Sequence, residues 1–146
     1  MKILYYKDIR LEYLDYIDDL EGIDPYYIYV IYLKEGKEEI GRITFRLGSN
    51  QDHYYDGHIG YTIEPPYRGH HFAYQACLAL KPLILNYYQE VILTCSPDNI
   101  ASKKTIEKLN TTYLETAKIP SHLKKYFTKQ ETMKCIYKWQ LLSLKK

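Results

Sequence analysis

The order of apolar and polar residues predicts strands and helices along the whole chain. In residues 8–20, the apolar residues Tyr13, Leu14, Ile17 and Leu20 fall on one helical face with acids opposite, which predicts a first helix. The segment EGIDP at 21–25 ends that helix. Residues 26–47 contain two β-branched, apolar runs around a polar turn at Gly36, which is typical of a hairpin.

The second strand of this hairpin has a clear alternation. Its two faces are apolar (Ile43, Phe45, Leu47) and polar (Arg42, Thr44, Arg46). Successive strand residues point to opposite faces, so one face is expected to be buried and the other wet. LGSNQDHYYDG at 47–57 reads as a loop, and HIGYTI at 58–63 reads as a further strand that ends at the prolines of EPP.

The second half alternates between helices and strands. Residues 68–88 carry apolar residues at helical spacing, with Pro82 expected to kink or divide the helix. EVILTC at 90–95 is a wholly apolar run, typical of a strand buried on both faces. SPDN then caps a helix at 100–109, and the last two strands are expected at 111–119 and 133–142.

This element order predicts the α/β class. The strand–helix–strand unit in the middle implies a right-handed crossover, and hence a mixed sheet. No linker, repeat or low-complexity tract interrupts the 146 residues, so residues 1–146 are expected to form a single domain.

The net charge argues against nucleic-acid binding, and the distribution of charge suggests a preference for a cationic substrate. A net charge of +2 argues against a dedicated nucleic-acid binder. The charges are uneven, because residues 1–24 hold seven acids against three bases while residues 101–146 hold eleven lysines against three glutamates. An acidic first helix that lines an acceptor cleft would favour a cationic substrate; the other interpretation is a solvated helix face.

The remaining bulk features point to a cytoplasmic protein. No apolar run approaches the ~20 residues needed to span a bilayer, so no membrane partner is expected, and the N-terminus does not resemble a cleavable signal. Three cysteines, Cys77, Cys95 and Cys135, are odd in number and spaced like no zinc site. We therefore expect reduced thiols and no metal.

The stretch YRGHHFAYQA, Tyr67 to Ala76, is the main candidate for binding chemistry. A strand leads straight into a helix here, and the first turn of a helix has backbone N–H groups without partners and a partial positive charge. Together with Arg68, this makes an anion site suited to a pyrophosphate. Neighbouring histidines on a helix point ~100° apart, so His70 and His71 do not form a metal pair.

These residues resemble the acyl-CoA loop of the GCN5-related N-acetyltransferase (GNAT) superfamily, Arg/Gln-x-x-Gly-x-Gly/Ala. Arg68 takes the first position, His71 the glycine position and Ala73 the last. Downstream, PDNIASKKTIEKLN is similar to the family's Asn-x-x-Ser helix, with Asn99 and Ser102 in register. The resemblance covers residues 58–109. Because any residue can supply an N–H at negative φ, we expect His71 to lie within the first helical turn as a tolerated substitute for glycine.

The resemblance implies a single-domain fold with a mostly antiparallel sheet flanked by helices, in which the fourth and fifth strands, 58–63 and 90–95, splay apart. It implies acetyl-CoA in that opening, with the pantetheine arm on the backbone of Ile63; Tyr61 and Thr62 are the neighbouring choices. By the same resemblance the remaining cofactor contacts are Arg68, Gly69, His70, His71, Phe72, Ala73, Asn99 and Ser102.

The implied reaction is direct attack of a substrate amine on the thioester, with two proton transfers. An amine of pKa near ~10 must lose a proton, and His58 is a candidate base; the alternative is a structural histidine at a strand end. Tyr126 lies where family members place a phenol that protonates the CoA thiolate. Cys95 would be the nucleophile of a covalent route, but its apolar surroundings favour a buried structural thiol.

Two other functions stay open at this level. One is a non-catalytic acyl-CoA sensor or interaction module on the same fold, and the other is an unrelated phosphate-binding protein in which the His pair matters. For the enzyme, the acceptor would be a small-molecule or peptide amine. The apolar C-terminal strand offers an edge for a homodimer.

Overall fold

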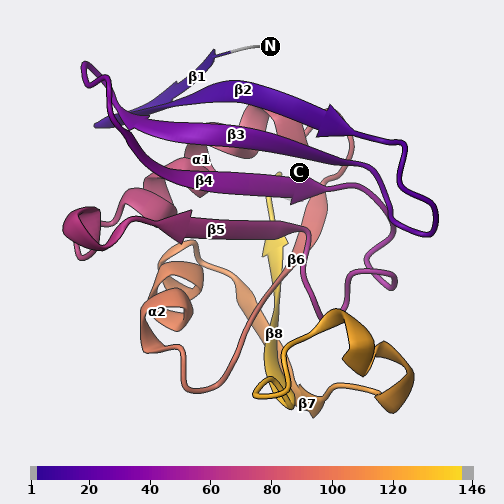
Figure 1. The fold of residues 1–146 in the computed structure, drawn as a ribbon. Helices are drawn as coiled ribbons and strands as arrows, with labels where there is room; N and C mark the ends of the chain where they lie inside the picture. The colour runs from indigo at the N-terminus through magenta and orange to yellow at the C-terminus, as the bar shows by residue number, and fades with distance from the viewer. Residues whose placement is uncertain (1–2, 143–146) are drawn as a thin grey trace.

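The computed structural model describes residues 3–142, which form two antiparallel sheets and two α-helices (Figure 1). The larger sheet has its strands in chain order: β1 (Ile3–Tyr6), β2 (Ile9–Ile17), β3 (Tyr26–Leu33), β4 (Glu39–Arg46) and β5 (Ile59–Ile63). The smaller sheet has the order β6 (Glu90–Cys95), β8 (Met133–Gln140), β7 (Thr112–Lys118). The helices are α1 (Phe72–Ile84) and α2 (Ile100–Lys108), with short 3-10 turns at Pro65–Tyr67 and Ser121–Tyr126.

The helix predicted over residues 8–20 is wrong, because this segment forms β2. Ile9 and Leu11 are completely buried and alternate with the half-buried Arg10 and Glu12, as a strand requires. A register shift between Tyr13 and Asp15 then breaks the period of two, and this break made the later apolar residues fall at helical spacing. The preceding strand β1 was not predicted.

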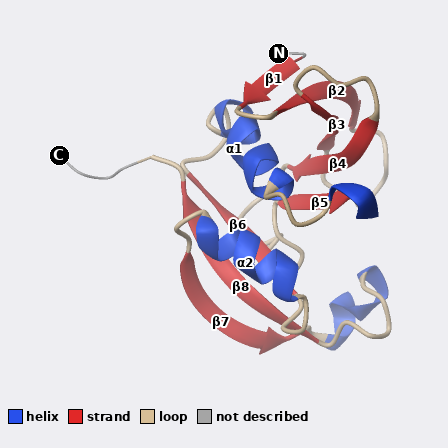
Figure 2. Ribbon diagram, turned by 90° about the vertical axis from the view of Figure 1, so that its left-hand side faces the viewer, coloured by secondary structure: helices blue, strands red, loops and turns tan. Residues whose placement is uncertain are grey.

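The predicted hairpin is confirmed as β3 and β4. Ile43 and Phe45 are completely buried, whereas Arg42 on the alternate face is exposed. The buried face packs against α1 (Figure 2). This helix supplies Ala76, Leu80 and other apolar side chains to the core.

The helix predicted over 68–88 is shorter, because α1 begins at Phe72 and ends at Ile84. Pro82 does not divide it. The proline lies in the last turn of the helix, two residues before its end. The other helix agrees closely with its prediction, and its N-cap Asn99 accepts a hydrogen bond from the Ser102 amide.

The strands β5 and β6 belong to different sheets and diverge from a contact between the residue before β5 and the middle of β6, which confirms the predicted splay (Figure 1). At this contact, the backbone N–H of His58 donates to the carbonyl of Ile92 at 2.8 Å. The two strands are joined through α1, and the expected mixed sheet is divided at this point into two antiparallel sheets.

Two further features concern the surface. The C-terminal strand β8 lies between β6 and β7, so both of its edges are already paired and it offers no edge to a second copy. Within residues 3–142, no helix has the length and apolar character needed to cross a membrane.

Candidate active site

The loop from β5 to α1 presents backbone amides at the start of the helix. Gln75 is the first residue of α1 whose N–H bonds back along the chain, to the His71 carbonyl at 3.0 Å. The amides of Phe72, Ala73 and Tyr74 therefore have no helical acceptor. No side chain caps this end and no acid lies in its first turn, so its positive end is available to an anion.

The conformation of His71 differs from the prediction. It is the N-cap residue of α1 and has φ of 64°, in the left-handed region, instead of a negative φ inside the first turn. Gly69, two residues earlier, also has a positive φ of 87°. The chain reverses here to enter the helix, so position 71 does need the conformation that glycine adopts at low cost.

Substitutions of His71 should therefore distinguish the cost of backbone strain at this position from a contribution of its side chain to ligand binding. A left-handed residue that is not glycine costs roughly 1–2 kcal/mol, and a β-branched side chain costs the most. We expect His71→Gly to keep or raise the melting temperature and to keep acetyl-CoA affinity, and His71→Val to lower the melting temperature. Scanning calorimetry and titration with acetyl-CoA check this; loss of binding in His71→Gly would assign a contact to the imidazole.

Arg68 links this loop to the open edge of β5. Its Nε donates to the Ile63 carbonyl at 2.7 Å, while the Glu64 amide bonds to Ile40 on β4. Because neighbouring residues of an antiparallel strand direct their backbone groups to opposite sides, Tyr61 and Ile63 face the opening and Thr62 faces β4. Ile63 and Tyr61 thus remain candidates for the pantetheine arm, and Thr62 does not.

Asn99 and Ser102 lie at the start of α2, beside the same opening. The hydroxyl of Ser102 is hydrogen-bonded to Tyr61 Oη at 2.8 Å, which joins α2 to β5, and burial raises the pKa of Tyr61. Further along α2, the ammonium of Lys108 lies 5.0 Å from the ring centre of Tyr74 in the first turn of α1. Lys108 was not predicted and brings a cation next to the anion site.

A cavity of about 660 Å³ lies at the other end of β5. It is bounded by residues 22–26, by β4 and the loop before β5, and by the segment around the 3-10 turn Ser121–Tyr126. Its charged lining consists of Asp24, Arg46, Asp52, His53, Asp56, Glu131 and Lys134, and its aromatic lining of Tyr26, Tyr55, Tyr126 and Phe127.

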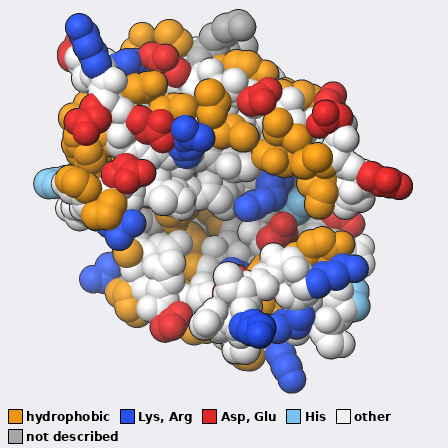
Figure 3. All heavy atoms as spheres, in the orientation of Figure 1, with side chains coloured by type: hydrophobic (Ala, Val, Ile, Leu, Met, Phe, Trp, Pro, Cys, Tyr) orange, Lys and Arg blue, Asp and Glu red, His pale blue; other side chains and the backbone are white. Residues whose placement is uncertain are grey.

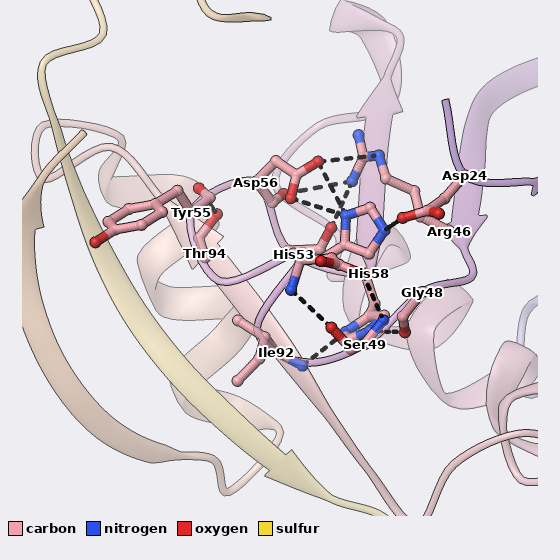
Figure 4. Close-up of polar contacts among 12 residues, drawn as sticks. Asp24, Arg46, Gly48, Ser49, His53, Tyr55, Asp56, His58, Ile92 and Thr94 are labelled. Carbon is pink, nitrogen blue, oxygen red and sulfur yellow. Dashed lines mark hydrogen bonds and ion pairs between the residues drawn. The ribbon is translucent and has the colours of Figure 1, made fainter. Parts of the chain in front are cut away.

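His53 stands at the centre of a charge network in this cavity (Figure 4). Its Nδ1 lies 3.0 Å from an Asp56 oxygen, and its Nε2 lies 2.6 Å from the Leu47 carbonyl and 3.1 Å from Asp24. All of these partners accept hydrogen bonds, so both nitrogens donate. Burial works to lower the pKa of His53, but the hydrogen bond and charge of Asp56, with Leu47 and Asp24, raise it above the ordinary value.

His58 is close to His53 but has the opposite character. It is completely buried, and burial lowers its pKa to about 4. Its Nδ1 accepts from the Ile92 amide at 3.0 Å and its Nε2 donates to the Gly48 carbonyl at 3.2 Å (Figure 4). Both nitrogens are occupied by backbone, so this geometry favours the structural role over the catalytic one.

A comparison with protein families identifies one family. A family model described as an acetyltransferase (GNAT) domain matches residues 8–112. The chain belongs to the GNAT acetyltransferase family. It is therefore an acyltransferase whose donor is acetyl-CoA. Membership in this family also removes the alternative of an unrelated phosphate-binding protein.

Solved structures share the fold of this acetyltransferase at low sequence identity. The ribosomal L7/L12 α-N-protein acetyltransferase RimL in complex with coenzyme A has a TM-score of 0.66 at 15% identity, over 95% of this chain and 98% of that one. A GNAT-family acetyltransferase from Bacillus anthracis has 0.68 at 15%, with the same coverage. The microcin C7 self-immunity acetyltransferase MccE with acetyl-CoA and AMP has 0.61 at 16%, over 79% of this chain and 61% of that one. A search of curated protein sequences finds no match.

The loop from β5 to α1 of this acetyltransferase carries groups that suit the phosphates of acetyl-CoA. The exposed amides of Phe72 to Tyr74 and the cation of Arg68 suit a pyrophosphate, and the open edge of β5 suits an amide-containing arm. His70 is exposed beside the loop, with its ring 5.5 Å from that of Phe72. The predicted donor residues thus lie between the end of β5 and the start of α1, and at the start of α2, where Ser102 is hydrogen-bonded to Tyr61 of β5.

Tyr126 and Cys95 lie in different surroundings. Tyr126 lines the cavity and is 59% exposed, so its phenol is accessible. Cys95 is buried in β6, and burial raises the pKa of its thiol to about 11. This pKa keeps the thiol protonated at neutral pH, in agreement with the structural role expected for it.

The cavity network itself was not predicted. Asp24 was noted only as one of seven acids, and His53 and Asp56 lie in a loop without a recognisable motif. Within residues 3–142, no three His, Cys, Asp or Glu side chains are arranged to hold a metal ion.

Proposed function

We propose that this acetyltransferase transfers the acetyl group to an amine by direct attack on the thioester of acetyl-CoA. One observation carries the proposal: the anion site and the charged cavity lie at opposite ends of β5, and the open edge of that strand runs between them. A donor whose phosphates lie at α1 can extend along Ile63 and Tyr61 and bring its acetyl group towards the cavity.

The charge of the cavity favours a cationic amine as acceptor. Four carboxylates (Asp24, Asp52, Asp56 and Glu131) stand against Arg46 and Lys134, so the cavity is net acidic with His53 in either protonation state. The cations are already engaged, since Arg46 donates to the Gly57 carbonyl at 2.9 Å and Lys134 pairs with Glu131 at 3.2 Å. Asp24 pairs with His53 through Oδ2, but its side chain is 40% exposed, so its other carboxylate oxygen can face an ammonium group.

The two proton transfers of the reaction are assigned to different groups. The ammonium, with a pKa near ~10, loses its proton to water at the open mouth of the cavity, because His58 is not accessible. Tyr126 protonates the leaving thiolate, since its phenol is an accessible donor in the cavity wall. We also propose a cytoplasmic location, for which the three free, buried cysteines are the support.

Removal of the Tyr126 hydroxyl should slow turnover without weakening donor binding. A positioned general acid contributes about 10²-fold or more, so Tyr126→Phe should lower kcat by roughly that factor at unchanged acetyl-CoA affinity. Thiol release measures the rate, and calorimetry measures binding. The matched control is Cys95→Ala, which should keep kcat within a few-fold; an acetyl group trapped on Cys95 would contradict direct attack.

An acceptor screen tests the activity and the charge preference together. Polyamines, aminoglycosides and peptides with basic N-termini should be acetylated faster than amines that carry carboxylates. Equal rates on both groups would contradict the charge argument. Tight acetyl-CoA binding with no turnover on any amine would favour the alternative, a non-catalytic acyl-CoA sensor.

A further inference from the structure

The cavity proposed for the acceptor lies between two walls that differ in charge. The first, the sheet wall, comes from residues 22–26, from Thr44 and Arg46 of β4 and from residues 52–56. The second, the β8 wall, comes from the segment between β7 and β8 and from the start of β8, and it holds Leu123, Tyr126, Phe127, Glu131 and Lys134. In Figure 3, basic side chains gather over the lower part of the molecule, around the segment that carries the β8 wall.

Lys134 is the buried cation of the β8 wall. Its side chain is 9% exposed, and its ammonium pairs with Glu131 at 3.2 Å. The same ammonium lies 5.5 Å from the ring centre of Phe127. A carboxylate next to an aromatic face is a combination that binds ammonium groups, through a charge-assisted hydrogen bond and a cation–π interaction. The β8 wall thus contains an ammonium site, and the chain fills it with its own lysine.

Glu131 is held in place by contacts that do not involve Lys134. Its carboxylate accepts a hydrogen bond from the Thr128 amide at 2.9 Å, and its backbone carbonyl accepts one from the Lys124 ammonium. Its side chain is 28% exposed, so water can solvate the carboxylate when Lys134 is replaced. A substitution of Lys134 should therefore leave this carboxylate in position and open to another cation.

The sheet wall keeps carboxylate oxygens for a ligand. Asp24 and Asp56 contact His53 at 3.1 and 3.0 Å, but their side chains are still 40% and 37% exposed. Asp52 is exposed as well. These three acids exceed the charge of Arg46 and His53 on the same wall, with His53 in either protonation state. An ammonium group of the acceptor is therefore best held at the sheet wall.

We propose that Lys134 determines how many positive charges the acceptor carries. Its ammonium occupies the site on the β8 wall, so the cavity takes an amine with one ammonium group, held at the sheet wall, and disfavours a diamine whose charges reach both walls. Lys124, and Lys125 at 5.3 Å from the ring centre of Tyr126, add to this effect, because a second ammonium group would meet like charges. This specificity rests on the proposed function, which assigns the cavity to the acceptor.

Binding of paired probes tests this specificity without any turnover. The probes are α,ω-diamines from diaminopropane to diaminooctane, each compared by calorimetry with the monoamine of the same length in the absence of acetyl-CoA. The parent should bind each monoamine at least as tightly as the matching diamine. A diamine that binds to the parent more than about tenfold more tightly than its monoamine would overturn the proposal.

Lys134→Met should reverse the preference. Methionine has a similar length but no charge, so Glu131 and the face of Phe127 become available to the second ammonium group of a diamine. For the diamine that fits the cavity best, the ratio of the monoamine Kd to the diamine Kd should rise about 10-fold or more, because a hydrogen bond to a charged group contributes at least that factor. A lysine with a purely structural role would leave this ratio unchanged.

Two further variants identify the site. Lys134→Met combined with Glu131→Gln removes the carboxylate as well, so the ratio should return to within about threefold of the parent. Lys125→Met makes the same change of charge on an exposed lysine of the same segment and should also leave the ratio within about threefold of the parent. A gain that persists without the carboxylate, or an equal gain in Lys125→Met, would show a general effect of charge and reject the proposal.

Folding and activity are measured separately. Circular dichroism and the melting temperature show whether Lys134→Met folds; if it does not, Lys134→Gln, whose amide can donate to Glu131, carries the same test. An unchanged ratio in the folded variant, or no binding of any amine to it, would overturn the proposal. Because acetyl-CoA is absent from the titrations, a gain of diamine affinity in a protein that acetylates no amine would support the role of Lys134 and reject the proposed transfer.

Discussion

Arg68→Glu will weaken acetyl-CoA binding by about 100-fold. The guanidinium stands at the mouth of the loop whose amides at Phe72 to Tyr74 lack helical acceptors. A hydrogen bond to a charged group contributes about 1.5–3 kcal/mol, and each 1.4 kcal/mol is a tenfold change in Kd. Reversal of the charge adds repulsion of the pyrophosphate in place of the lost attraction.

The measurement is calorimetric titration with acetyl-CoA at two salt concentrations. The control is Lys37→Glu, an equal change of charge on an exposed residue in the turn between β3 and β4, which should bind like the parent. The loss in Arg68→Glu should be larger at low salt, because screening weakens both the attraction and the repulsion. A Kd within threefold of the parent would show that the phosphates lie elsewhere.

The parts of the fold that were predicted correctly are those decided by local pattern. The β3–β4 hairpin follows from two alternating runs around Gly36, and β6 follows from the apolar run EVILTC. The start of α2 follows from the side chain of Asn99, which satisfies an amide three residues on. In each case the interaction that stabilises the element lies within a few residues of sequence.

The errors came from features without a local signature. The bulge between Tyr13 and Asp15 depends on how β2 pairs with β3. It shifts the apolar residues of β2 to a spacing that resembles that of a helix. The left-handed φ of His71 is set by the path of the chain into α1, where histidine stands in place of glycine.

The proposed donor and acceptor sides of the site differ in the same way. The proposed donor side consists of the continuous segment from β5 to α1 and the start of α2, so a motif could identify it. The proposed acceptor side joins Asp24, Arg46 and His53 from three separate segments, and only the folded chain brings them together. His53 and His58 show what the sequence alone does not predict. They are five residues apart, but their surroundings in the folded chain shift their pKa values in opposite directions.

The stability of this acetyltransferase should fall by about 3 kcal/mol as the pH is lowered from 6.5 to 4, because of His58. Its pKa in the folded chain is about 4, against 6.5 for an exposed histidine. The unfolded chain therefore takes up the proton first. The contribution of His58 is fully present above 6.5 and is lost as the pH falls to the folded pKa, at up to about 1.4 kcal/mol per pH unit.

The other histidine and carboxyl groups with shifted pKa values act outside the range between pH 6.5 and 4.5. His53 has a raised pKa, so its contribution is present below 6.5 and is lost only as the pH rises through its folded pKa. Glu39 and Glu131 have lowered pKa values, and their contributions decline only below the ordinary value of 4.5. The slope between pH 6 and 5 therefore reports mainly on His58.

Urea unfolding of the parent, His58→Phe and His122→Phe across this range separates the effects. His58→Phe should be less stable at pH 7 by about 2–4 kcal/mol, because the Ile92 amide and the Gly48 carbonyl lose their partner, and its stability should vary little between pH 6 and 5. His122 is exposed on the 3-10 turn, so His122→Phe should keep the slope of the parent. If His58→Phe keeps that slope as well, the acid sensitivity comes from another group, and His58 is not the neutral link between β5 and β6 that its two backbone hydrogen bonds imply.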